Sequence, residues 1–168
     1  MSYLLFLQVI MICKIIMKVI LAICLSLAIS LCQDKMNLVL LDDPSAICLD
    51  GSPGAYYYVR GSDPSTIVLY FEGGGWCGDR DLSSTIENCY QRSKTNYGSS
   101  KHYPSTVSYS DGILSDSEYN SYRNATRVIL RYCDGAGHQG TKSSPIQYKD
   151  TKLYFRGNNI TIAQLQDL

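Results

Sequence analysis

The stretch TIVLYFEGGGWC, residues 66–77, determines how the rest of the sequence is interpreted. Its first six residues are β-branched, apolar or aromatic, which is typical of a β-strand, and polar residues do not alternate with them. We therefore expect this strand to be buried on both faces, as an interior strand of a mostly parallel sheet is. Three consecutive glycines follow. The sequence thus predicts a glycine loop at the carboxyl end of a buried strand.

The segments on either side of this stretch predict a further strand and a helix. Residues 55–60 read AYYYVR and predict a preceding strand. The turn residues at 61–65 predict that the two strands form an antiparallel hairpin. After the glycines, residues 79–93 place apolar side chains at helical spacing and predict a helix.

The second half of the sequence predicts two more strands and a helix. Residues 126–132 and residues 152–157 are each typical of a short strand. A helix is expected to begin at Ile160, with Asn158 or Asn159 as its N-terminal cap.

The first 32 residues are almost entirely apolar, and Lys14 and Lys18 divide them into two shorter pieces. A membrane span needs about 20 uninterrupted apolar residues, which neither piece provides. Starting from Met17, the pattern matches a short signal peptide. We expect residues 1–32 to be a signal peptide, with Met17 as the true start, and residues 33–168 to be secreted. An uncleaved anchor is the alternative, and it would be the only expected contact with a membrane.

Charge and cysteine content restrict the possible functions. The 15 basic and 15 acidic residues balance, so no basic surface for nucleic acid is expected. An even number of cysteines outside the leader predicts two disulfides in an oxidising compartment, although the spacing leaves all three pairings open. A zinc site is disfavoured because no C-x-x-C pair occurs and His102 and His138 are the only histidines. Those cysteines are Cys48, Cys77, Cys89 and Cys133.

Two further patterns concern modification and ligand binding. The N-x-[ST] sequons at Asn124 and Asn159 are glycosylation acceptors and fit a secreted chain. A phosphate-binding loop is disfavoured because no Gly-Lys-[Ser/Thr] follows the three glycines. No cofactor and no metal ion is therefore expected.

The triple glycine suits one particular chemistry. Glycines at the end of a strand let the backbone expose its N–H groups, which side chains would otherwise obstruct. Backbone donors about 2.7–3.1 Å from an acyl oxygen that becomes negative form an oxyanion hole. A plain glycine turn is the alternative explanation of these three residues.

Four sequence blocks together resemble the pectin acetylesterase/Notum family of secreted carboxylesterases. They are CLDGSPGAYY at 48–57, YFEGGGWC at 70–77, RYCDG at 131–135 and LYFRG at 153–157, and the resemblance extends from about residue 38 to residue 162. It implies an α/β-hydrolase fold, a Ser-Asp-His triad, and removal of acyl groups from a carbohydrate or a lipidated protein.

The resemblance also assigns individual residues. Gly74, Gly75 and Trp76 match the oxyanion loop of the family, and Trp76 is placed to form a wall of the acyl pocket. The implied disulfides join Cys77 to Cys89 and Cys48 to Cys133. Asp134 and Ser52 are expected to stabilise turns, and the two histidines are not expected to be catalytic.

The sequence departs from the family pattern at one decisive place. The nucleophile of the family lies in a Gly-x-Ser-x-Gly pentapeptide, and no such pentapeptide occurs here. We therefore expect residues 33–168 to be the N-terminal part of an α/β-hydrolase domain, with an incomplete sheet and no esterase activity by itself. The alternative is a secreted, disulfide-bonded module that binds a glycan or a protein without catalysis. Its binding surface would be the tyrosine-rich polar stretch around residues 94–121.

Overall fold

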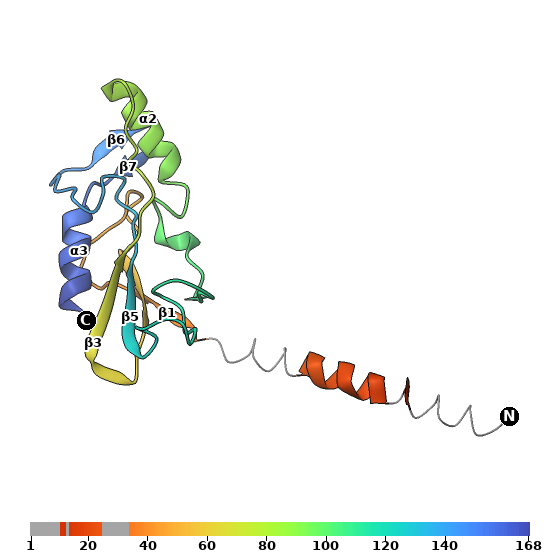
Figure 1. The fold of residues 1–168 in the computed structure, drawn as a ribbon. Helices are drawn as coiled ribbons and strands as arrows, with labels where there is room; N and C mark the ends of the chain where they lie inside the picture. Colours follow the sequence, from red (N-terminus) through yellow and green to blue (C-terminus); the bar gives the residue numbers. More distant parts are fainter. Residues whose placement is uncertain (1–10, 13, 25–33) are drawn as a thin grey trace. The chain divides into compact units, whose positions relative to one another are not determined.

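The computed structural model describes residues 11–12, 14–24 and 34–168 (Figure 1). The chain consists of two units, Met1–Asp34 and Lys35–Leu168. In the first unit, residues 14–24 are helical. None of the helices in this described part has both the length and the apolar character needed to cross a membrane. The expected cleavage site after residue 32 lies outside the described residues.

The second unit is built on a five-stranded mixed sheet in the order β3-β5-β2-β1-β4. β3 and β5 are parallel, whereas β5–β2, β2–β1 and β1–β4 are antiparallel pairs. The strands 55–60, 66–71 and 126–132 expected from the sequence are confirmed to within a few residues. The bounds are β1 Met36–Leu40, β2 Ala55–Val59, β3 Asp63–Phe71, β4 Thr106–Val107 and β5 Ala125–Leu130.

The predicted hairpin of β2 and β3 is wrong, because β5 lies between them. β5 is the most buried strand of the sheet, with Val128, Ile129 and Leu130 at most 1% exposed. β5 is central because both of its backbone edges are paired, one with β2 and the other with β3. The short turn between β2 and β3 therefore connects strands that do not pair.

β3 was expected to be buried on both faces and is instead at the edge of the sheet. No strand in residues 34–168 pairs with its outer side. Within its apolar run only Val68 is buried, while Ile67, Leu69, Tyr70 and Phe71 are 38–50% exposed. An apolar strand with one free edge and exposed side chains is unusual in a soluble protein.

Two helices accompany the sheet. α2, Leu82–Arg92, confirms the helical prediction and begins at a capping box formed by Asp81 and Ser84. α3, Gly157–Gln166, begins three residues earlier than expected and has no side-chain cap, so the prediction of an asparagine cap is wrong. α3 packs on β2, where the buried amide of Gln164 donates a 2.7 Å hydrogen bond to the Ala55 carbonyl.

Smaller elements complete the unit. β6, Ile146–Tyr148, and β7, Thr151–Leu153, form a separate antiparallel pair, so the expected strand at 152–157 is shorter and shifted. Apart from the core of the sheet, a smaller apolar cluster includes two residues of α2. Its buried members are Leu49, Cys77, Cys89, Tyr90 and Leu153. In the tyrosine-rich polar stretch at residues 94–121, the only regular elements are the single turn η1, Ser100–His102, and β4.

Candidate active site

The triple glycine leaves the sheet at the edge where two parallel strands end. β3 and β5 run in the same direction, and the amide of Glu72 donates a 3.1 Å hydrogen bond to the Leu130 carbonyl at the end of this pair. Residues 73–76, here called the glycine loop, follow directly. Residues 131–134 leave β5 at the same edge. The loop therefore lies at the carboxyl edge of the sheet, which is where ligand sites of α/β folds are found.

The three glycines of the loop differ in whether the structure could accommodate a side chain. Gly75 has a φ of 68°, in the left-handed region that a residue with a side chain rarely adopts. At Gly74 a Cβ atom would lie 2.8 Å from ring atoms of Tyr97 and 3.0 Å from the ring of Tyr132. Gly73 has open space around it. Backbone conformation therefore requires glycine at position 75, and close packing requires it at position 74.

The backbone amides of the glycine loop are free. The N–H groups of Gly73, Gly74, Gly75 and Trp76 donate no hydrogen bond to any atom of the described chain. All four residues are exposed, and Trp76 is 76% exposed. Free amides that face solvent are available to an anionic group.

Two carbonyls of the same loop, those of Gly74 and Gly75, are bonded. The guanidinium of Arg92 donates to the Gly74 carbonyl oxygen. The hydroxyl of Tyr132 donates a 2.8 Å hydrogen bond to the Gly75 carbonyl and accepts a 3.1 Å bond from the amide of Gly137. Neither anchor was singled out from the sequence. The Cys-x-x-Arg spacing of Cys89 and Arg92 is the signal that could have found Arg92, since residues three apart share a helix face.

A buried ion pair supports the base of the loop. Arg131 Nη1 lies 2.5 Å from Glu72 Oε1, and Glu72 Oε2 accepts a 3.1 Å hydrogen bond from the Tyr132 amide. The Arg131 guanidinium also lies over the ring of Tyr103, 4.1 Å from its centre. Burial raises the pKa of Glu72 above its usual value even with Arg131 beside it. Burial likewise raises the pKa of Tyr103 to about 12.

The residues after β5 stabilise the loop from the other side. Asp134 is 1% exposed, and its carboxylate accepts hydrogen bonds from the amides of His138 and Gly140 at 3.1 and 3.4 Å. It thus stabilises its turn, as expected. The His138 ring donates from Nε2 to the Glu72 carbonyl at 2.9 Å. His102 lies at the end of η1 and is exposed.

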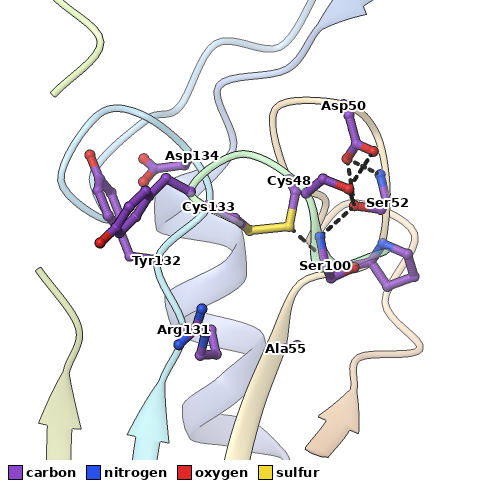
Figure 2. Close-up of a disulfide and its surroundings, with 12 residues drawn as sticks. Cys48, Asp50, Ser52, Ala55, Ser100, Arg131, Tyr132, Cys133 and Asp134 are labelled. Atoms are coloured by element: carbon purple, nitrogen blue, oxygen red, sulfur yellow. Dashed lines mark hydrogen bonds between the residues drawn. A yellow bond between two sulfur atoms is a disulfide. The ribbon is translucent and has the colours of Figure 1, made fainter. Parts of the chain in front are cut away.

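The structure joins Cys48 to Cys133 and Cys77 to Cys89, which is the pairing that the resemblance implies. The first bridge connects the 48–54 turn to the segment that follows β5, directly after Tyr132 (Figure 2). The second connects the residue after the glycine loop to α2. Both disulfides therefore fasten segments that border the candidate site.

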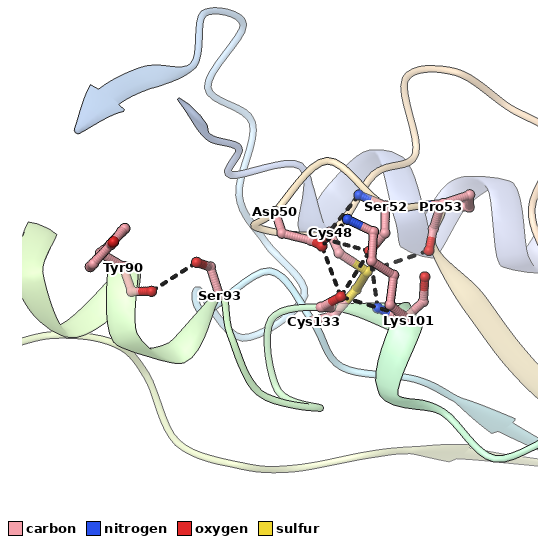
Figure 3. A network of polar contacts seen from close by, with 10 residues as sticks. Cys48, Asp50, Ser52, Pro53, Tyr90, Ser93, Lys101 and Cys133 are labelled. Carbon is pink, nitrogen blue, oxygen red and sulfur yellow. Dashed lines mark hydrogen bonds and ion pairs between the residues drawn. A yellow bond between two sulfur atoms is a disulfide. The ribbon is translucent and has the colours of Figure 1, made fainter. Parts of the chain in front are cut away.

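A polar network next to the first disulfide fixes the turn at residues 50–52 (Figure 3). Asp50 accepts hydrogen bonds from Ser52 and Ser99 at 2.5 and 2.8 Å and forms a 3.0 Å ion pair with Lys101. Burial raises the pKa of Asp50, but the bonds from Ser52 and Ser99 outweigh it and lower the pKa overall. Ser52 is buried and acts within this turn, as expected.

A shallow cavity of about 430 Å³ lies beside the glycine loop, lined by Gly74, Tyr97 and residues from the end of α2. Trp76 does not line it, so the expected wall of an acyl pocket stays a prediction. Groups of His, Cys, Asp and Glu that could hold a metal ion do not occur among the residues described.

Comparison with known proteins identifies the family. The family model described as pectinacetylesterase matches residues 30–168. The chain belongs to the pectin acetylesterase family. Pectin acetylesterase 4 of Arabidopsis thaliana is 37% identical over 126 residues, which cover 73% of this chain and 29% of that protein. The palmitoleoyl-protein carboxylesterase Notum of Homo sapiens is 33% identical over 113 residues, 66% of this chain and 22% of that protein.

The structural comparison agrees on the fold. The Wnt deacylase Notum from Drosophila superposes with a TM-score of 0.68 at 24% identity, over 80% of this chain and 38% of that one. The pectin acetylesterase family and its Notum relatives are carboxylic ester hydrolases, which places this α/β chain in an esterase family. The chain spans less than a third of the length of the curated relatives it matches.

Proposed function

We propose that this chain forms the oxyanion-binding part of a secreted carboxylic ester hydrolase of the pectin acetylesterase type. Its substrate class is an acylated carbohydrate, with acetyl esters of cell-wall polysaccharide first, or an acylated protein. The oxyanion donors are backbone amides of Gly74, Gly75 and Trp76. Without a Gly-x-Ser-x-Gly nucleophile the chain has no esterase activity by itself, since donors alone form no acyl-enzyme.

One observation carries this proposal, which is the combination of free amides and bonded carbonyls in the glycine loop. The amides of any exposed turn can bond to water, so the distinguishing feature is the anchoring of the Gly74 and Gly75 carbonyls, which fixes the direction of the free amides. Here the loop is held from its carbonyl side at the carboxyl edge of the sheet. A developing negative oxygen there would meet donors that need no rearrangement.

Secretion is the second part of the proposal. The two disulfides of the body support an oxidising compartment, because cytosolic thiols are kept reduced. The apolar leader at residues 1–32 supports export, with cleavage near residue 33. Asn124 is exposed in the turn before β5 and is the sequon that is open to glycosylation.

A chimera tests the activity directly. Residues 35–168 are joined to the remaining C-terminal part of Arabidopsis pectin acetylesterase 4, and hydrolysis of 4-nitrophenyl acetate is measured. We expect an active enzyme in which Gly75→Ala lowers kcat/KM by up to about 100-fold, because alanine disfavours the left-handed φ of 68° and a misdirected amide costs as much as a lost oxyanion donor. Gly78→Ala is the matched control, because Gly78 has open space and no left-handed φ. Equal kcat/KM values for the two variants would refute an oxyanion role for the loop.

The same chimera tests which length of acyl chain the enzyme prefers. Rates with acetyl and octanoyl esters of one alcohol are compared. A preference for the octanoyl ester of about a hundredfold, equivalent to roughly 2.7 kcal/mol in the transition state, would exclude the polysaccharide acetate as the substrate.

A non-catalytic binding module is the second candidate, and one observation favours it. A cavity of about 490 Å³ in the 111–122 segment is lined by Tyr119, which is 89% exposed, and by Tyr122, which is 48% exposed. Exposed tyrosine rings suit stacking on sugars. Tyr103 does not contribute, since it is buried under Arg131. A module of this kind would melt as one cooperative unit and stay monomeric, whereas a partial sheet with the free edge of β3 would aggregate.

A further inference from the structure

The glycine loop is held by two side chains from different elements, and they act on consecutive peptide groups. Arg92 donates to the carbonyl of Gly74, and Tyr132 donates to the carbonyl of Gly75. In a planar trans peptide the C=O of one residue and the N–H of the next point in opposite directions. Arg92 therefore sets the direction of the Gly75 amide, and Tyr132 sets that of the Trp76 amide.

The two anchors lie close together and bind neighbouring carbonyls. The guanidinium carbon of Arg92 lies 5.4 Å from the centre of the Tyr132 ring. Each N–H points away from the side chain that binds the carbonyl of the same peptide group. The N–H groups of Gly75 and Trp76 are both free. Two consecutive free amides are available to an anionic group.

The anchors are themselves held in place. The Arg92 guanidinium lies near the rings of both Tyr97 and Tyr132, 5.2 and 5.4 Å from their centres. This stacking restricts a side chain that would otherwise be mobile. Tyr132 is 2% exposed, and its hydroxyl is fixed by the Gly137 amide as well as by the loop.

Each disulfide lies next to one anchor. Cys89 is one helical turn before Arg92 in α2, and its partner Cys77 directly follows the glycine loop. This bridge fixes the separation between the loop and Arg92. Cys133 follows Tyr132, and its bridge to Cys48 fixes the backbone that carries the tyrosine (Figure 2).

We infer that Arg92 and Tyr132 are positioning residues for the oxyanion site, each aiming one amide donor, with Gly75 and Trp76 as the two donors. The inference rests on the proposed function. It reduces the proposed oxyanion donors from three to two by leaving out the Gly74 amide. The carbonyl of Gly73 has no partner in the described chain, so no side chain sets the direction of the Gly74 N–H. A charge-assisted bond to the Gly74 carbonyl also polarises the attached Gly75 N–H and strengthens it as a donor.

The test uses backbone amide NMR on the full 15N-labelled chain, secreted from yeast. Tyr132→Phe removes one hydroxyl and keeps the ring, and we expect the Trp76 amide proton to move upfield more than that of Gly75. Arg92→Met should shift the Gly75 amide more, and Arg92→Lys should restore part of that shift. Tyr154→Phe and Arg80→Lys are the matched controls. The Tyr154 hydroxyl has no hydrogen-bond partner in the described chain, and Arg80 is exposed.

A kinetic measurement on the chimera separates this inference from the proposed function. We expect Tyr132→Phe and Arg92→Met each to lower kcat roughly 10- to 100-fold while KM changes less than about twofold, because the donors act on the transition state. An active chimera in which both variants match their controls, in amide shifts and in kcat, would overturn the inference and leave the esterase assignment intact. An inactive chimera with the expected pair of selective amide shifts would refute the function and support the aiming of the amides.

Discussion

Alanine replacement at each of the three glycines is expected to give three different losses of stability. At Gly73 a Cβ meets nothing within 4 Å and the backbone is not left-handed, so the change in unfolding free energy should stay within about 0.5 kcal/mol. At Gly75 the space is equally open, but the φ of 68° costs a residue with a side chain about 1–2 kcal/mol. The contrast isolates conformation from packing.

Gly74→Ala tests packing alone. Its Cβ would lie 2.8 Å from ring atoms of Tyr97 and 3.0 Å from Tyr132, so a ring must move. Tyr132 is 2% exposed and has no room, whereas Tyr97 is 39% exposed and can be displaced. We expect a loss of about 1–3 kcal/mol, as for other overpacked sites.

Thermal unfolding of the full chain, followed by circular dichroism with both disulfides oxidised, measures these losses. For a chain of this size 1 kcal/mol lowers Tm by about 2–4 °C. Gly75→Ala should therefore lower Tm by about 2–8 °C and Gly73→Ala by less than about 2 °C. In a Tyr97→Ala background the cost of Gly74→Ala should fall, which a double-mutant cycle detects. Equal Tm values for the three single variants would refute the description of the loop.

Three other predictions concern the rest of the unit. Replacing both cysteines of the bridge with a separation of 85 residues should cost about 2 kcal/mol more than replacing those of the bridge with a separation of 12, measured by urea unfolding; the reverse order would contradict the entropic account. Asn124→Gln should abolish the mass decrease caused by peptide-N-glycosidase, whereas Asn159→Gln should not, because the Asn159 amide lies in α3 and donates to Ser45 at 3.2 Å. The raised pKa of Glu72 means that its protonated form favours the folded state, so its contribution to stability is present below its ordinary pKa of 4.5 and is lost as pH rises through the folded value. As pH rises from below 4.5 through the folded pKa, the unsubstituted chain should therefore lose stability relative to Glu72→Gln, as measured by urea unfolding at each pH. A constant difference would show that the pKa is not raised.

Local patterns in the sequence identified β2, β3 and β5, the helix α2 and the position of the glycine loop, but not β1, β4 or β6. The hydrophobic run at residues 126–132 indicates a buried strand, and the helical spacing of apolar residues at 79–93 indicates a helix, because both signals depend on near neighbours in the chain. The pairing of strands does not depend on near neighbours in the chain. The strand order depends on contacts between residues far apart in the chain, and the turn residues at 61–65 predicted a pairing of β2 with β3 that does not occur.

The anchors of the loop illustrate a second limit. The glycines are visible in the sequence because their conformational role is local, whereas Tyr132 lies 57 positions from the carbonyl that it binds. The sequence does not distinguish an arginine that is exposed to solvent from one that binds a backbone carbonyl. Only the Cys89 spacing connects Arg92 to the loop, and its meaning requires the pairing with Cys77. The family resemblance supplied that pairing, and the residue pattern alone left it open.

The unpaired outer side of β3 predicts that copies of this chain associate in a way that depends on concentration. A row of unpaired backbone groups flanked by Ile67, Leu69 and Phe71 is as complementary to a second copy as to any other strand. Two copies related by a twofold axis would add β3 to β3 and build one continuous sheet across the dimer. Dilution would then reverse the assembly, and a charge placed on this strand would prevent it. Sedimentation across a range of dilutions is therefore the first measurement to make on any purified sample, before spectra or kinetics are interpreted.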